Sequence, residues 1–141
     1  MTASDFASVL RGADLRVTAP RLAILAAVEN RPHSEAETIF GDVSAALGSV
    51  SRQAVYDSLN ILADVGVLRR IAPSARAALY EIAPLDNHHH FLCRECGSLF
   101  DVPCQVGSAP CLNPPENHRM EVDVAEVLYR GTCSNCLTTS V

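Results

Sequence analysis

Two pairs of cysteines give the clearest chemical signal in this sequence. Cys93 and Cys96 form one CxxC pair, and Cys133 and Cys136 form another. Each pair can present two thiolates from one tight turn, and four thiolates are the ligand set of a closed, tetrahedral structural Zn²⁺ site. The 97–132 segment between the pairs is longer than the usual gap of a zinc ribbon, so such a site must join two separate strands of a small sheet. Four unrelated thiols are the alternative.

A run of three histidines stands just before the first cysteine pair. In a strand, alternate residues share a face, so His88 and His90 should point to one side and His89 to the other. Two imidazoles on one face can bind a divalent cation, and carboxylates such as Glu81 and Asp101 can complete its ligand shell. A solvated polar patch is the alternative interpretation.

The first part of the chain has the pattern of a winged helix-turn-helix domain. Apolar residues at helical spacing predict three helices, the cap at Thr18 predicts another, and two short extended segments then predict a strand hairpin. The order of helices first and hairpin last is typical of this domain. The expected features are a helix with Phe6, Val9, Leu10 and Ala13 on one face, a helix capped by Thr18, a helix opened by a capping box at 34–37, a helix from Ser51 to about Gly66, and strands at 67–71 and 78–82.

The fourth predicted helix carries a polar face that could contact DNA. Arg52, Gln53, Tyr56 and Asn60 stand three or four residues apart, away from the apolar stripe. Such side chains can hydrogen-bond base edges or phosphates, and a helix fits the major groove. A solvated helix surface is the alternative, and the neighbouring Asp57 favours it.

Composition limits the choice of partner and compartment. The chain has 141 residues, 48% of them hydrophobic and 19% charged, which is typical of a packed protein of at most two small domains. Its longest apolar run, residues 22–28, is too short to cross a bilayer, so we expect a cytoplasmic protein without a membrane partner. Thiols stay reduced in that compartment, which favours metal binding over disulfides. Most of the net charge of −5 lies after Pro84, and an acidic segment favours cation binding. The negative net charge does not exclude DNA binding, because DNA contact needs only a local basic face.

An ordered set of motifs resembles the ferric uptake regulator family over nearly the whole chain. These motifs are residues 15–21, Val55–Tyr56, the three histidines followed by residues 93–97, and residues 129–133. The resemblance implies an α+β protein with an N-terminal winged helix-turn-helix DNA-binding domain at 1–83 and a small C-terminal α/β dimerisation domain at 84–141. A hinge would lie around 83–87.

The resemblance also implies roles for particular residues. A regulatory site for Fe²⁺, Mn²⁺ or Zn²⁺ would fall on His33, Glu81, His88, His90 and Asp101. The structural zinc would be held by the four cysteines of the CxxC pairs. Arg16 resembles the family's basic residue that reaches the minor groove, and Tyr56 its base-contacting tyrosine.

The function implied is that of a metal-dependent repressor, not an enzyme. It would bind operator DNA as a homodimer and would take no small-molecule substrate. A cation held by both halves would select the arrangement in which two recognition helices match successive major grooves.

Two further cysteines point to one branch of the family. Cys104 and Cys111, each preceded by proline, resemble the oxidative-stress branch linked to catalase-peroxidase genes. We predict that they form a reversible disulfide, with two inert thiols as the alternative. Asp101 resembles the choice of peroxide sensors, which predicts oxidation of His33 or His88 beside bound iron. Prolines at 110, 114 and 115 predict a loop where the family usually has a helix.

Three other functions remain as alternatives. One is a zinc-uptake type of sensor with the same fold. A zinc hydrolase could draw ligands from His33, Glu81, His88 and His90, but the chain has no HExxH motif. A thiol redox protein would use CxxC catalytically, although two zinc-spaced pairs fit structural ligation better.

Overall fold

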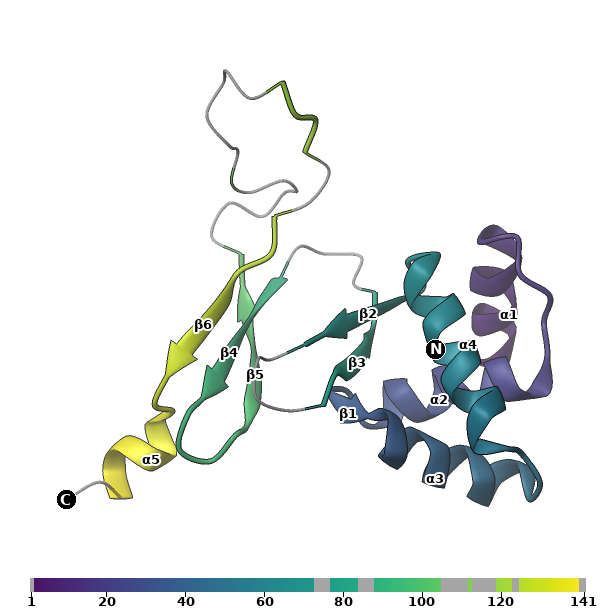
Figure 1. Ribbon diagram of the computed structural model, residues 1–141, viewed down its shortest axis with the longest axis horizontal. Helices are drawn as coiled ribbons and strands as arrows, with labels where there is room; N and C mark the ends of the chain where they lie inside the picture. The colour runs from purple at the N-terminus through teal and green to yellow at the C-terminus, as the bar shows by residue number, and fades with distance from the viewer. Residues whose placement is uncertain are drawn as a thin grey trace. The chain divides into compact units, whose positions relative to one another are not determined.

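The computed structural model describes residues 2–72, 77–83, 88–104, 112, 119–122 and 125–139. The chain separates into two compact units, Met1–Ala83 and Pro84–Val141. The first unit contains most of the helices, and the second is built around strands (Figure 1). Within the described part of the chain, no helix has the length and apolar character needed to span a membrane.

Four helices make up most of the first unit, and side-chain caps set where three of them begin. The Thr2 hydroxyl and the Asp5 carboxylate form a capping box at the first helix, which satisfies N–H groups that have no partner inside the helix. Thr18 accepts a hydrogen bond from the Arg21 N–H at 3.3 Å, as expected, and Ser51 accepts one from the Ala54 N–H at 3.0 Å. The helices are α1 (Ala3–Gly12), α2 (Ala19–Asn30), α3 (Ala36–Leu47) and α4 (Arg52–Asp64).

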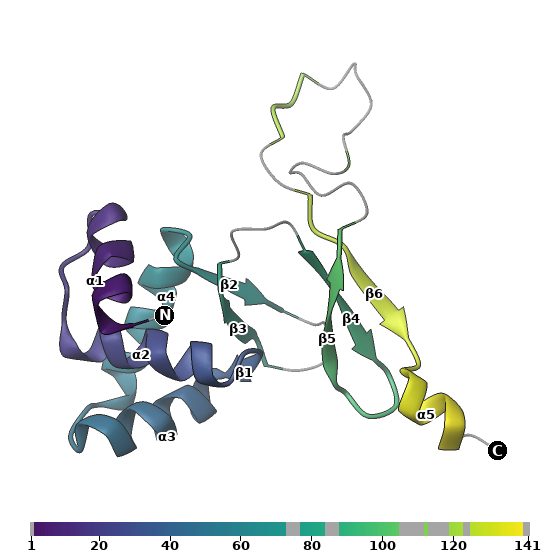
Figure 2. The same ribbon diagram turned by 180° about the vertical axis from the view of Figure 1, so that it is seen from behind.

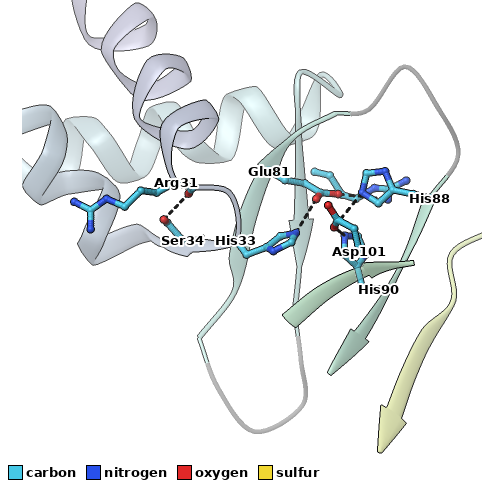
Figure 3. A network of polar contacts seen from close by, with 8 residues as sticks. Arg31, His33, Ser34, Glu81, His88, His90 and Asp101 are labelled. Carbon is cyan, nitrogen blue, oxygen red and sulfur yellow. Dashed lines mark hydrogen bonds and ion pairs between the residues drawn. The ribbon is translucent and has the colours of Figure 1, made fainter. Parts of the chain in front are cut away.

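The predicted capping box at 34–37 is wrong. Ser34 and Glu35 form a short strand, β1 (Ser34–Glu35), and Glu35 stands at the N-cap of α3 without a side-chain hydrogen bond. The Ser34 hydroxyl instead donates to the Arg31 carbonyl at 2.6 Å (Figure 3). Ser34 pairs with Tyr80 of a distant strand, and this pairing fixes its backbone in the extended conformation.

The first unit ends in the predicted hairpin, which gains a third strand from β1. The strands β2 (Leu68–Ile71) and β3 (Leu79–Ile82) pair antiparallel, and the sheet order is β1-β3-β2. Gly66, at a φ of 82°, lets the chain leave α4 and turn into β2, as predicted from its position. The register places Arg69 directly opposite Glu81.

The core of the first unit lies between its helices and the hairpin. On the inward faces expected for α3 and α4, five residues are buried and three more are partly buried against them. The buried residues are Ile39, Val43, Val55, Leu59 and Leu62, and the partly buried ones are Ala36, Phe40 and Leu47. Burial of a side chain of this size contributes about 1.5–3 kcal/mol. The core therefore holds α4 and the hairpin in a defined arrangement, which makes the unit a winged helix-turn-helix.

The second unit is built on a three-stranded sheet (Figure 2). Its elements are β4 (His88–Cys93), β5 (Leu99–Pro103), β6 (Leu128–Gly131) and α5 (Ser134–Thr139). The strand order is β5-β4-β6, in which β5 is antiparallel and β6 parallel to the central strand. The prediction that prolines at 110, 114 and 115 replace a helix with a loop falls outside the described residues, as do positions 84–87 of the expected hinge.

Candidate functional site

The two CxxC pairs meet because β4 and β6 lie side by side. Cys93 ends β4, and in the parallel register it stands opposite Gly131, two residues before Cys133. The Arg94 N–H donates to the Gly131 carbonyl at 2.8 Å and continues this pairing beyond the strand. Cys96 follows on the turn towards β5, and the second pair lies where the chain enters α5.

The four sulfurs have the spacing of a tetrahedral metal site. Cys93 Sγ lies 3.8 Å from Cys136 Sγ, and Cys96 Sγ lies 3.8 Å from Cys133 Sγ. All four sulfurs are within 4.8 Å of one another. A Zn–S bond of about 2.3 Å in tetrahedral geometry corresponds to S–S separations of about 3.8 Å. The donor set therefore fits Zn²⁺ in both chemistry and size.

The thiols of this cluster differ in acidity. Hydrogen bonds from the backbone N–H groups of Cys96 and Cys133 lower the pKa of the Cys93 thiol to about 6. The Ser98 hydroxyl, 3.3 Å from the Cys96 sulfur, lowers the pKa of that thiol as well. Contact with the Cys133 sulfur, followed by burial, raises the pKa of the Cys136 thiol to about 12. Four adjacent thiolates repel one another, so full deprotonation of the cluster requires a bound cation.

A histidine and carboxylate cluster lies on the sheet of the second unit. His90 stands opposite Asp101 in the β4–β5 register, and its Nε2 lies 3.4 Å from Asp101 Oδ1. His88 Nε2 lies 3.5 Å from the same oxygen (Figure 3). His89 takes the opposite face, where its Nδ1 accepts a hydrogen bond from the Val127 N–H at 3.2 Å. The predicted alternation of the three histidines is confirmed, and two imidazoles and one carboxylate of this unit converge.

A second cluster lies wholly within the first unit. His33 adopts a φ of 65°, and its backbone N–H donates to the Tyr80 carbonyl at 2.9 Å. Its Nε2 lies 3.1 Å from Glu81 Oε2 (Figure 3). Arg69 Nη1 lies 3.5 Å from the other oxygen of the same carboxylate. Of the five residues expected in the regulatory site, the first unit therefore supplies His33 and Glu81, and the second unit supplies His88, His90 and Asp101.

The polar face expected on α4 is solvent-accessible and is also tied to neighbouring side chains. Arg52 and Tyr56 both contact the carboxylate of Glu37 on α3. The guanidinium of Arg52 also stacks over the Phe40 ring, 4.6 Å from its centroid. These contacts lower the pKa of Glu37, chiefly through its hydrogen bond with Arg52, and raise the pKa of Tyr56, chiefly through its hydrogen bond with Glu37.

The rest of this face makes hydrogen bonds along α4 and to the hairpin. Gln53 Nε2 donates to Asp57 Oδ1 at 2.8 Å along α4. Asn60 Oδ1 accepts from Arg70 Nη2 of β2 at 2.6 Å, and Arg70 Nε lies 3.2 Å from the Tyr80 hydroxyl. The sequence did not single out Arg69 or Arg70, and it singled out Glu37 only as part of the predicted capping box. The contacts of these three residues run between distant segments of the chain, so no periodic signal marks them.

The remaining expected positions are only partly described. Arg16 is exposed between α1 and α2, and its carbonyl accepts a hydrogen bond from Arg21 Nη1 at 2.8 Å. Cys104 is half-buried directly after β5, whereas Cys111 lies outside the described residues. The proposed 104–111 disulfide therefore stays a prediction.

Comparison with known proteins gives consistent matches. Residues 12–107 match the model of the ferric uptake regulator family. The chain is 53% identical over 132 residues to the transcriptional regulator FurA of Mycobacterium tuberculosis, covering 94% of this chain and 90% of that protein. It is 50% identical over 138 residues to ferric uptake regulation protein 2 of Mycolicibacterium fortuitum, covering 96% and 94%. The solved structure of the Helicobacter pylori ferric uptake regulator Fur matches with a TM-score of 0.71 at 18% identity, covering 100% of this chain and 97% of that one.

A winged helix-turn-helix unit followed by a small sheet with a thiol cluster defines a metal-binding regulator of the α+β class. The chain belongs to the ferric uptake regulator family. Members of this family are metal-dependent transcriptional regulators, so the prediction that the chain is not an enzyme is confirmed, and the zinc hydrolase and thiol redox alternatives are wrong.

Proposed function

We propose that this protein is a cytoplasmic homodimer that represses transcription by binding operator DNA when a divalent cation occupies its regulatory site. The observation that carries the proposal is the presence of candidate cation ligands in both units of one chain. His33 and Glu81 lie beside each other in the DNA-binding unit. His88 and His90 share Asp101 in the other unit.

The cysteine cluster has a different role in this proposal. Four cysteine thiolates leave no coordination position open, so a Zn²⁺ ion there would stabilise the fold without sensing anything. The tight binding expected of such a site is a folding free energy, because the unfolded chain does not hold the four sulfurs together. Cys93, Cys96, Cys133 and Cys136 would therefore keep the second unit folded whether or not the regulatory site is filled.

The regulatory site would bind its ion through imidazole and carboxylate groups alone. This donor set accepts Fe²⁺, Mn²⁺ and Zn²⁺, and the metal available in the cell selects among them. When His33 and Glu81 share one ion with ligands of the second unit, the orientation of the two units is restricted. We propose that this restriction selects the arrangement in which both recognition helices of the dimer reach successive major grooves.

The DNA contacts are assigned to α4 and its surroundings. Arg52, Gln53, Tyr56 and Asn60 are accessible on one face of that helix, and arginine and amide groups are suited to reading base edges. Arg16 would add a minor-groove or phosphate contact. The hydrogen bond between Asn60 and Arg70 supports a common surface for the helix and the hairpin.

Similarity to FurA and to ferric uptake regulation proteins supports a role in iron homeostasis. The Cys104 and Cys111 motif further supports control of oxidative-stress genes, including catalase-peroxidase genes, with derepression on metal loss or on oxidation by peroxide. A zinc-uptake type of sensor is the second candidate, because zinc is bound more tightly than iron or manganese by such ligands.

The test is a comparison of operator binding at defined metal loading. Protein that retains about one Zn²⁺ per chain in the cysteine cluster is titrated with Mn²⁺, Zn²⁺ or, without oxygen, Fe²⁺, and DNA binding is followed by fluorescence anisotropy. We expect metal-dependent operator binding by the parent protein and no operator binding by a His33→Ala, His90→Ala double variant. Equal operator affinity of the two proteins at every loading would overturn the proposal.

A further inference from the structure

Arg69 and His33 both lie beside the buried carboxylate of Glu81, and His33 and Glu81 are proposed cation ligands. Arg69 and Glu81 stand directly opposite each other in the antiparallel β2–β3 register. Their side chains are only 14% and 6% exposed, so both charged groups lie largely out of water. A buried carboxylate without an oppositely charged partner strongly destabilises the folded state, and the Arg69 guanidinium is such a partner for Glu81.

The two oxygens of Glu81 face different partners. Oε2 lies 3.1 Å from His33 Nε2, and Oε1 lies 3.5 Å from Arg69 Nη1. One of these partners is a proposed metal ligand, whereas the other is a guanidinium that stays protonated at every accessible pH. A permanent positive charge therefore stands at the carboxylate that a divalent cation would use.

Arg69 can act on cation binding in two opposite ways. By orienting Glu81 it would favour binding, as groups that hydrogen-bond a metal ligand generally do. Its charge, however, repels a doubly charged ion on the same carboxylate. The Nη1–Oε1 distance of 3.5 Å is at the limit of a hydrogen bond, so Arg69 orients Glu81 only weakly. The repulsion between the guanidinium and the metal ion does not depend on that geometry, and salt screens it little at a buried position. The repulsion should therefore be the larger effect.

We propose that Arg69 is an internal competitor for Glu81 that lowers the affinity of the regulatory site for divalent cations. In the metal-free protein its guanidinium compensates the buried carboxylate and keeps the hairpin folded. In the metal-bound protein the two cations share Glu81, and affinity is reduced. The site is thereby set to respond to a higher concentration of metal than its ligands alone would require. This inference rests on the proposed regulatory site.

The experiment measures Mn²⁺ binding to the full chain with its cysteine-bound zinc retained, by electron paramagnetic resonance of the free ion. Arg69→Gln keeps a hydrogen-bond donor but removes the charge, and should bind Mn²⁺ at least about tenfold more tightly, which corresponds to about 1.4 kcal/mol. Arg69→Lys keeps the charge and should change affinity by less than about threefold. Arg70→Gln, on the same strand but bonded to Asn60 and Tyr80, is the matched control and should have the parent affinity.

Two results would overturn the inference. One is unchanged or weaker Mn²⁺ binding by Arg69→Gln, and the other is an equal gain in Arg69→Lys. If Arg69→Gln does not fold, Arg69→Met removes the same charge while keeping an apolar stem, and the same outcomes apply. The Glu81→Gln variant tests the proposed function separately from this inference. It should lose Mn²⁺ binding at the regulatory site. Unchanged Mn²⁺ binding by this variant would show that Glu81 is no ligand.

Discussion

Cys93 Sγ, at the end of β4, lies 3.8 Å from Cys136 Sγ in α5, so the two thiols bring these elements together. We predict that Cys93→Ser and Cys136→Ser lose the tightly bound zinc and at least about 3 kcal/mol of stability, because structural zinc binding is part of the folding free energy. Metal content by mass spectrometry and unfolding by urea would measure both. Cys104→Ser is the control and should keep its zinc. A Cys93→Ser protein that is folded and fully zinc-loaded would remove the four-cysteine site.

The proposed DNA contacts predict separate effects on DNA binding and on metal binding. Tyr56→Phe and Arg16→Ala should each weaken operator binding and leave the metal content unchanged, because neither residue belongs to a proposed metal site. If Arg16 makes one phosphate contact, its loss should also reduce the slope of log affinity against log salt by about one unit. Anisotropy titrations at several salt concentrations provide the measurement. Unchanged operator affinity in both variants would contradict the assigned surface.

Glu37 should act as a positioning residue for this surface. Its carboxylate contacts Arg52 and Tyr56 and partly neutralises the guanidinium. Glu37→Gln should raise the affinity for non-specific DNA several-fold, because a negative charge facing the phosphates is lost, and should narrow the ratio of operator to non-specific affinity. Competition binding with unrelated duplex DNA measures this ratio, and Glu29→Gln on α2 is a charge-matched control. A ratio that is unchanged or larger in Glu37→Gln would argue against a positioning role.

Peroxide should act on the iron-loaded protein alone. An open coordination position on Fe²⁺ can activate peroxide, and the nearest imidazoles, His33 and His88, are then the expected targets. Oxidation of either histidine would weaken metal binding and so release the DNA. The oxidised peptide would gain about 16 Da, the mass of one oxygen atom. Peptide mass spectrometry and operator binding after exposure would test this for each metal, with the Zn²⁺ form as the redox-inert control. Equal responses of the zinc and iron forms, without oxidised histidine, would favour thiol chemistry instead.

Local patterns in the sequence determined much of this protein. The caps at Thr18 and Ser51, the buried faces of α3 and α4, and the end of α4 at Gly66 follow from residues within a few positions of one another. The alternation of the three histidines follows from strand geometry alone. Helix caps and side-chain periodicity depend on near neighbours, so they can be predicted without knowing the fold.

Contacts between distant segments were decided by the tertiary structure. Ser34 lies in β1 instead of capping a helix, because pairing with Tyr80 and the hydrogen bond to Arg31 take its backbone and its hydroxyl. The pairing of Arg69 with Glu81 depends on the register of the hairpin, which no spacing in the sequence specifies. A shift of one residue in the pairing would leave Arg69 and Glu81 on opposite faces of the sheet. Only the packed core, which fixes the register, could therefore bring the guanidinium and the carboxylate together.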